Sequence, residues 1–132
     1  MVVNIKIIEE WLKKANEDFR FASCSLEDLE DKFYAQILFH FQQAAEKYLK
    51  GYMLYLSIEL KKIHDLVELL EIIKKEDAEI VELMDEVDML NDYYIETRYP
   101  AHWPTGYTKK LCEEARGVVK KIKEWVEGKI EK

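Results

Sequence analysis

Proline and glycine are scarce in this chain, with two prolines and four glycines among 132 residues. Because both residues interrupt helices and strands, their scarcity predicts long regular elements joined by few tight turns. Cysteine is also rare. Cys24 and Cys112 lack the spacing of metal ligands, so neither a disulfide framework nor a zinc site is predicted. We expect both to be reduced thiols in or beside the core of a cytoplasmic protein.

Long apolar runs are absent as well. No uncharged segment reaches the roughly 18 residues of a membrane-spanning helix, and the first residues do not resemble a signal peptide. Charged residues make up 36% of the chain and hydrophobic residues 48%, a balance that excludes a disordered protein. We expect a single domain over residues 1–132, with no contact with a membrane and no cofactor.

Positive charge is in deficit, since the net charge is −7. This excludes a general nucleic-acid coat, which needs a cationic surface. Residues 109–132, however, carry eight basic and five acidic side chains, so this segment alone is suited to face an anion. A solvated helix surface is the alternative interpretation. The abundance of Lys and Glu, with few Asn and Gln, is typical of a thermophile.

Hydrophobic periodicity predicts an all-α fold, because apolar residues recur at three- and four-residue steps and no segment alternates as a strand does. The expected helices cover residues 5–24 with an extension toward 30, 33–57, 64–75, 78–97 and 107–130. Asp77 is the predicted cap of the fourth, and Thr105 or Thr108 that of the fifth. The second is apolar over so wide a face that we expect it at the centre of an up-and-down bundle of four long helices and one short helix. Glu46 and Lys50 are expected to pair on its exposed side.

The stretch "IETRYPAHWP", residues 95–104, gathers both prolines, an arginine, a histidine and a tryptophan. The prolines must end the fourth helix. Arg98 offers paired donors to phosphate oxygens, and a histidine such as His102 exchanges protons near neutral pH. Tyr94 and Tyr99 lie close by in the sequence. These residues, together with His40 on the second helix, are the predicted nucleotide- or phosphate-binding site, and Arg98 with His102 is the predicted catalytic pair.

Each of these residues also has a structural interpretation. Arg98 can pair with an acidic side chain or with the carboxyl end of a helix, and His102 can bond to the backbone of a loop. His40 can be a boundary side chain with one polar partner, and His64 or Asp65 can help to start the short helix. The tyrosines can serve bundle packing, with their hydroxyls at the rim.

Four motifs resemble those of the HEPN domain family. They are "ANEDFRFAS" on the first helix, "FHFQQAAEKYLKGYMLY" on the second, "IHDLVELL" at the start of the third, and "TRYP" at the end of the fourth. Together they cover most of the chain in the order of the family. The resemblance implies a helical bundle that is usually a homodimer and is often encoded beside a minimal nucleotidyltransferase.

Several branches of that family are metal-independent ribonuclease toxins that use an Arg and a His from each subunit of a dimer. Arg98 matches the motif's arginine, and His102 is the one histidine that follows it. Three residues separate them, one fewer than the shortest family spacing. Pro104 stands where one toxin branch carries a modifiable tyrosine.

These observations leave three hypotheses. The first is a HEPN protein that binds a nucleotide or RNA through Arg98 and pairs with a minimal nucleotidyltransferase as in toxin–antitoxin systems. The second is an active ribonuclease toxin that uses Arg98 and His102 across a homodimer, without a metal. The third is a dimeric scaffold without a ligand. The shortened spacing favours the first hypothesis.

Overall fold

A computed structural model describes residues 4–28, 33–92 and 107–131. All regular structure in these three ranges is helical, which confirms the predicted all-α bundle. The helices are α1 (Ile5–Asp28), α2 (Tyr34–Tyr55), α3 (Leu66–Lys74), the 3-10 helix η1 (Ala78–Leu83), α4 (Met84–Asn91) and α6 (Lys109–Ile130). Among the described helices, none combines the length and the apolar character needed to cross a membrane.

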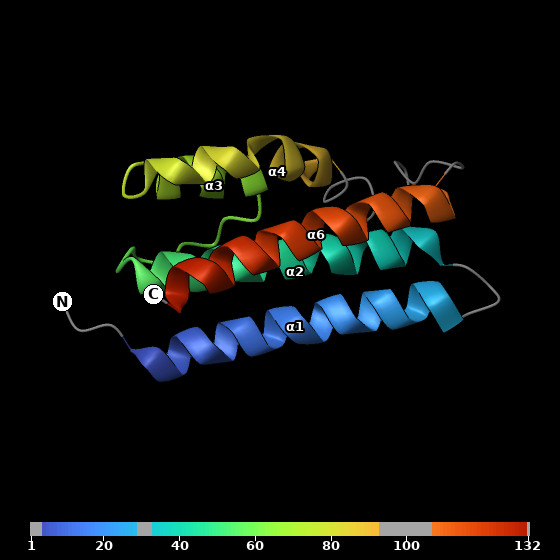
Figure 1. Ribbon diagram of the computed structural model, residues 1–132, viewed down its shortest axis with the longest axis horizontal. Helices are drawn as coiled ribbons and strands as arrows, with labels where there is room; N and C mark the ends of the chain where they lie inside the picture. The colour runs from blue at the N-terminus through green and yellow to red at the C-terminus, as the bar shows by residue number, and fades with distance from the viewer. Residues whose placement is uncertain (1–3, 29–32, 93–106, 132) are drawn as a thin grey trace.

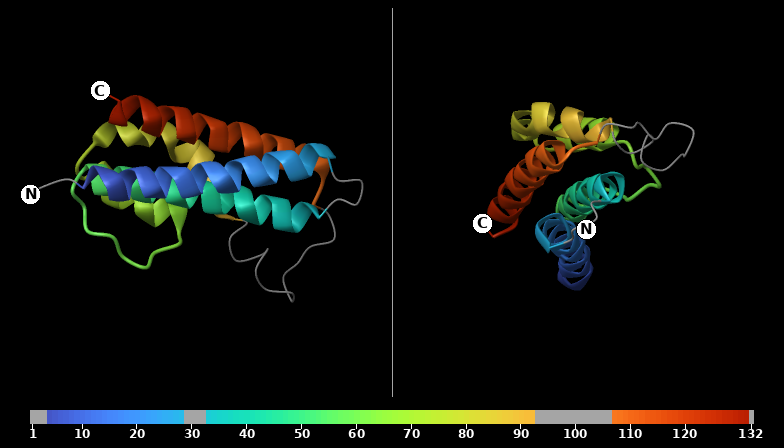
Figure 2. Two further views of the ribbon diagram at one scale, coloured as in Figure 1. Left: turned by 90° about the horizontal axis from the view of Figure 1, so that it is seen from below. Right: turned by 90° about the vertical axis from the view of Figure 1, so that its right-hand side faces the viewer.

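Helix α2 lies at the centre of the bundle and contacts α1, α6, α3 and α4 (Figure 1). Helix α1 runs antiparallel to α2, whereas α6 runs in the same direction as α2. The shorter helices α3 and α4 form a layer on the side of α2 and α6 that faces away from α1 (Figure 2). The central position explains why the apolar face of α2 is so wide.

The core is built mainly on α2, which buries residues over most of its circumference. Its buried residues are Ile37, Leu38, Phe41, Gln42, Ala44, Ala45, Glu46, Tyr48, Leu49, Lys50, Gly51, Tyr52 and Met53. The hydroxyl of Tyr48 donates a hydrogen bond to the side chain of Asn16 on α1, so the phenol is satisfied although it is buried. Helix α1 adds Ile8, Ala15, Ala22 and Leu26 to the core.

Helices α1 and α2 approach each other closely at Gly51. A Cβ atom at this position would lie 3.1 Å from Leu12 Cδ2 and 3.5 Å from Trp11 Cβ. The missing side chain therefore leaves room for Leu12 and Trp11 of α1 to pack against α2 at this level. Helix α2 ends at Tyr55, two residues before Ser57, whose φ of 62° is left-handed and incompatible with a continuing helix.

The fourth predicted helix differs from expectation at its start. Asp77 caps it as predicted, by accepting a hydrogen bond from the Glu79 backbone N–H at 3.1 Å, but the first six residues form η1 and only the next eight form α4. In a 3-10 helix, residues three apart lie in line. Ile80 and Leu83 are therefore both directed into the core. The predicted continuation to residue 97, including Tyr94, lies outside the described residues.

Asp77 also anchors this segment to the rest of the bundle. Its Oδ2 accepts a hydrogen bond from the Tyr52 hydroxyl at 2.5 Å and lies 3.1 Å from Lys129 Nζ. Lys129 Nζ is in turn 2.8 Å from Glu79 Oε2. One carboxylate thus connects α2, η1 and α6.

Helix α6 begins at the predicted cap Thr108, whose hydroxyl oxygen accepts a hydrogen bond from the Leu111 N–H at 3.1 Å. The apolar spacing of residues 107–130 predicts an inward face of Leu111, Ala115, Val118, Ile122, Trp125 and Val126, and the observed inward face is slightly rotated from it. Its fully buried residues are Cys112, Ala115, Val119, Ile122 and Val126, whereas Leu111, Val118 and Trp125 are half-buried at its edges. Of the two cysteines expected in or beside the core, Cys112 is buried but Cys24 is exposed, because it falls on the solvent side of α1.

Candidate functional site

Most of the predicted site lies in the segment 93–106, outside the described residues. This applies to Arg98, His102, Tyr94 and Tyr99, whereas His40 is described. Of the predicted site, the structure therefore describes His40. It also describes the residues that directly precede and follow the segment 93–106.

The chain enters this segment beside the start of α3. Asn91, the last residue of α4, accepts a hydrogen bond on its Oδ1 from the backbone N–H of Leu66 at 2.7 Å. Asp65 caps α3 by accepting from the Glu68 N–H at 3.0 Å, which confirms one of the two predicted starts. The hydrogen bond between Leu66 and Asn91 thus holds the end of α4 beside the start of α3, directly after His64. From the end of α4 the chain continues toward Arg98.

The chain leaves the segment beside the start of α2. The side chain of Tyr107 packs against the core, and the thiol of Cys112 donates a hydrogen bond to the backbone carbonyl of Tyr34 at 3.6 Å. Burial is the main cause that raises the pKa of Cys112, to about 12, and Glu113 adds to it. This thiol is therefore a structural donor and not a nucleophile.

A buried charged cluster lies next to the start of α3. Glu46 Oε2 is 3.0 Å from Lys50 Nζ and 3.0 Å from His64 Nδ1, and Glu46 Oε1 is 3.2 Å from the same imidazole nitrogen. Gln42 Nε2 donates to the backbone carbonyl of His64 at 3.4 Å. One carboxylate therefore holds an ammonium group and an imidazole, and the amide fixes the backbone that carries the imidazole.

The prediction that Glu46 and Lys50 pair is confirmed, but their predicted exposure is wrong. The two residues are only 5% and 6% exposed. The face of α2 that carries this pair is covered, because His64 contacts Glu46 and Trp11 of α1 lies beside Lys50. Buried charges are tolerated where each has partners, and here the carboxylate has two.

His64 was expected at most to help start α3, and the structure gives its side chain a different position. Asp65 provides the cap, while the imidazole reaches back to Glu46 and keeps 46% of its side chain exposed. The sequence signal for this contact is the wide apolar face of α2. A Glu and a Lys within so apolar a helix require partners from elsewhere in the chain.

His40 lies on a different face of α2. Its position is about 120° around the helix axis from Glu46, since successive residues are about 100° apart. Its Nδ1 is 3.5 Å from Asp18 Oδ1 on α1, within ion-pair range, and its ring meets the edges of Phe21 and Phe39. Its interpretation as a boundary histidine with one polar partner fits this geometry.

Asp18 is held as a carboxylate by its surroundings. Burial raises its pKa, but the neighbouring His40 and Lys47 outweigh burial and hold the pKa below its usual value. Lys47 Nζ lies 2.5 Å from Asp18 Oδ2. The Asp18–His40–Lys47 group thus ties α1 to α2. Within the described ranges, no three His, Cys, Asp or Glu side chains are placed to hold a metal ion.

Comparisons with known proteins agree with this architecture. A protein-family model described as the HEPN domain matches residues 8–129. The crystal structure of TT1696 from Thermus thermophilus is similar, with a TM-score of 0.80, 35% sequence identity, and coverage of 92% of this chain and 97% of that chain. The crystal structure of ST0689, an archaeal HEPN homologue, has a TM-score of 0.72, 26% identity, and coverage of 93% and 97%.

The comparison with curated proteins gave no match. The family model nonetheless spans almost the whole chain, and both solved structures agree with it in fold. The chain therefore belongs to the HEPN domain family.

Proposed function

We propose that this HEPN protein binds a phosphate-bearing ligand, a nucleotide or an RNA, through Arg98 and acts as the partner of a minimal nucleotidyltransferase in a toxin–antitoxin pair. Tyr94 and Tyr99 would contribute aromatic rings, and His40 and His102 further polar groups. An arginine suits this role because its guanidinium donates paired hydrogen bonds to phosphate oxygens and stays charged at all physiological pH values.

The hydrogen bond from Leu66 to Asn91 is the observation that carries this proposal. It attaches the chain leading to Arg98 beside a cluster in which Glu46, Lys50 and His64 are held in place. A binding residue is most effective where its support is ordered, and the described chain is held in this way as far as Asn91. The family's usual homodimer would bring two such sites into one assembly.

Binding of ATP and of a single-stranded RNA oligonucleotide tests the proposal. Loss of one charge-assisted hydrogen bond costs about 1.5–3 kcal/mol, so Arg98→Ala is expected to raise the Kd at least about tenfold. Arg20→Ala, which removes an exposed arginine of α1, is the matched control and should leave the Kd unchanged. Whether a minimal nucleotidyltransferase copurifies with the protein tests the partner.

The same samples, incubated with RNA in the presence of a chelator, separate binding from cleavage. Intact RNA, together with binding that depends on Arg98, supports the binding protein. Cleavage that disappears in both Arg98→Ala and His102→Ala, with the fold retained, supports the ribonuclease instead. Absence of both binding and cleavage in the unaltered protein contradicts the proposal and leaves the scaffold.

A further inference from the structure

The outer side of α6 has no role in the proposed function. Helix α6 lies at one edge of the bundle (Figure 2), and a Cβ atom at Gly117 would meet nothing within 4 Å. Between residues 110 and 124, the exposed side chains within about 60° of Gly117 around the helix axis are all charged. They are Lys110, Glu113, Glu114, Lys120, Lys121 and Glu124. Together with Gly117 they form the α6 outer face.

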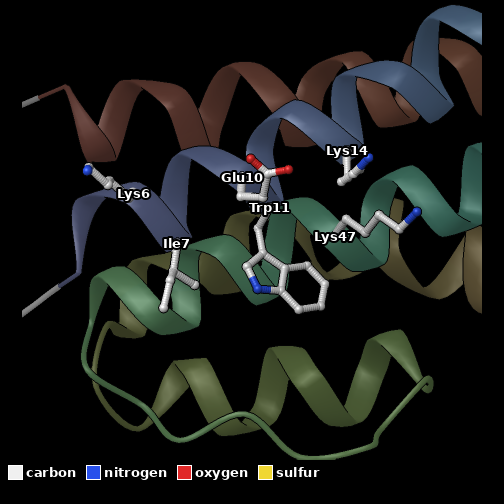
Figure 3. A pocket seen from close by; sticks show the side chains of 6 residues that line it. All are labelled: Lys6, Ile7, Glu10, Trp11, Lys14 and Lys47. Carbon is white, nitrogen blue, oxygen red and sulfur yellow. The ribbon is translucent and has the colours of Figure 1, made fainter.

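The α6 outer face differs in character from the cleft between α1 and α2. That cleft is apolar where Ile7 and Trp11 line it, and the ammonium groups of Lys14 and Lys47 point away from the indole (Figure 3). The α6 outer face carries three lysines and three glutamates, so its charges balance. On a chain with a net charge of −7, it is a neutral area at which a second acidic copy can approach with little repulsion.

The charges of this face are ordered about Gly117. Each charged residue has a residue of opposite charge equally far along the helix on the other side of Gly117. The matched residues are Lys110 with Glu124, Glu113 with Lys121, and Glu114 with Lys120. A second α6 that lies antiparallel across a twofold axis at Gly117 therefore presents an opposite charge to each of them. A uniformly basic or acidic partner would match only half of the face.

Most of these charges have no partner within the chain. Helix α6 forms its ion pairs through Arg116, Lys121, Lys123 and Lys129. Of the α6 outer face, only Lys121 is among them, and it contacts Glu86 of α4. The other five charged side chains of the face form no ion pair with any part of the chain that the structure describes. Their opposite charges are therefore available to a second copy.

The surface beside Gly117 is hollowed. A groove of about 500 Å³ is lined by Gly117, Lys120, Lys121, Glu124 and Trp125. Helices pack by inserting the side chains of one into the grooves of the other. Glycine lowers the stability of a helix, and no packing contact of the described residues requires one at position 117. A crossing helix provides such a reason, because the absent side chain lets the two backbones approach closely.

We infer that two copies of the chain associate through their α6 outer faces, antiparallel, with Gly117 at the crossing point. In this α6 contact, the two glutamates that precede Gly117 in one copy lie opposite the two lysines that follow it in the other. Lys110 lies opposite Glu124 in the same way. The contact is small and polar, so it is weak and depends on ionic strength.

The α6 contact is different from the family's usual homodimer, in which the Arg and His of both subunits meet. Because a helix rises about 1.5 Å per residue, the two copies of Thr108 lie roughly 27 Å apart along the paired helices. The two points at which the segment 93–106 joins α6 are thus kept apart. Where the family's homodimer forms, the α6 contact would join two such dimers. The inference does not depend on Arg98 or on any ligand.

Two charge-reversed variants of the full chain, studied alone and mixed, test the α6 contact. Glu113→Lys and Lys120→Glu each place like charges opposite one another in both symmetric halves of the contact. Each variant alone should raise the Kd of self-association roughly five- to thirtyfold, the range for loss of two exposed ion pairs, in sedimentation velocity at low salt. An equimolar mixture restores both pairs and should associate as the unaltered protein does. A mixture that associates no better than either variant alone overturns the inference.

Lys13→Glu is the matched control for net charge. It makes the same charge change as Lys120→Glu at an exposed position of α1, and it should leave the Kd unchanged. An equal loss of association in Lys13→Glu and Lys120→Glu assigns the effect to net charge and overturns the inference. Added salt should weaken the association of the unaltered protein. Association that does not respond to salt belongs to another surface and also overturns the inference.

A disulfide tests the crossing point itself. Packed helices bring two Cα atoms at a crossing point to within about 3–5 Å, close to the separation that a disulfide spans. Gly117→Cys, in a Cys24→Ala background, should therefore form a covalent dimer with oxidised glutathione. Gly128→Cys is the matched control, since its Cβ also meets nothing within 4 Å but its two copies lie roughly 33 Å apart in the α6 contact. Equal cross-linking of the two variants, or none in Gly117→Cys, overturns the inference.

Discussion

His64 Nδ1 lies 3.0 Å from Glu46 Oε2, a contact between residues eighteen positions apart that joins the approach to α3 to the middle of α2. The same carboxylate oxygen accepts from Lys50 at 3.0 Å. Glu46 therefore stabilises two cationic or polar groups at once, in a position only 5% exposed.

Removal of this carboxylate should be costly. Glu46→Ala leaves Lys50 buried without its partner, and breaking a buried pair in this way typically costs about 3–5 kcal/mol. Urea unfolding followed by circular dichroism measures the change. Glu17→Ala is the matched control, because Glu17 and Lys14 form an exposed pair that contributes at most about 1 kcal/mol. Similar losses for the two variants would contradict a buried cluster. Glu46→Leu combined with Lys50→Met should recover much of the stability.

Acid should weaken the connection made by Asp77. Burial raises the pKa of Asp77, but the hydrogen bonds from Tyr52 and Lys129 outweigh burial and lower the pKa below its usual value. Because the folded-state pKa lies below the unfolded one, the ionised carboxylate stabilises the fold at neutral pH. This stabilisation is lost as the pH falls through the folded-state pKa. We expect the urea midpoint to fall steeply below about pH 4.

Tyr52→Phe tests the source of that pH dependence. Burial and Asp77 raise the pKa of Tyr52, so its hydroxyl stays protonated and donates. The variant should lower the midpoint at pH 7 and flatten its fall in acid. Tyr55→Phe removes the hydroxyl from the ring that is stacked on Tyr52, and it should leave the acid profile unchanged. An unchanged profile in Tyr52→Phe would assign the acid sensitivity to other carboxylates, such as Asp18.

Alanine at the helical glycines should have different consequences in α2 and α6. At Gly117 a Cβ meets nothing within 4 Å, so Gly117→Ala should stabilise the protein by about 1 kcal/mol through helix propensity. At Gly51 the Cβ would press on Leu12 at 3.1 Å, and crowding in a packed core costs about 1–3 kcal/mol. Gly51→Ala is therefore expected to be neutral or destabilising in thermal unfolding. A gain equal to that of Gly117→Ala would show that Leu12 moves freely.

The two thiols should react at very different rates. Cys24 is exposed, whereas Cys112 is buried and its pKa is raised to about 12, so it holds very little thiolate at pH 8. A colorimetric disulfide reagent should label one thiol rapidly in the native protein and the second only in denaturant. Cys24→Ser should abolish the rapid phase. A rapid phase that survives this substitution would contradict the burial of Cys112.

The sequence predicted the helices well because their signals are local. The caps Asp77 and Thr108 follow from side chains that bond within two or three residues, and apolar spacing depends only on the helical repeat. The 3-10 start of the fourth helix was not predicted, since a short apolar segment is compatible with either helix type. The slight rotation of α6 was not predicted either. Val118 and Val119 are adjacent and both apolar, so apolar spacing alone does not decide which of the two is buried.

The exposure of Glu46 and Lys50 was mispredicted because the contacts that cover the pair are not local. Spacing identified the pair of Glu46 and Lys50, but only the return of the chain after α2 brings His64 to them and covers them. Exposure of a residue depends on every neighbouring element, which no helical repeat encodes. For the site itself, Arg98, His102, Tyr94 and Tyr99 stay predictions, and His40 is described beside Asp18.

The central position of α2 has a consequence for synthesis on the ribosome. Helices α1 and α2 are neighbours in sequence and can pair early, but the face of α2 that contacts α6 stays uncovered until residues 109–130 have been translated. During that interval the nascent chain exposes an apolar surface to solvent, and such a surface binds chaperones and favours aggregation. Slow translation of the final helix should therefore reduce the soluble yield.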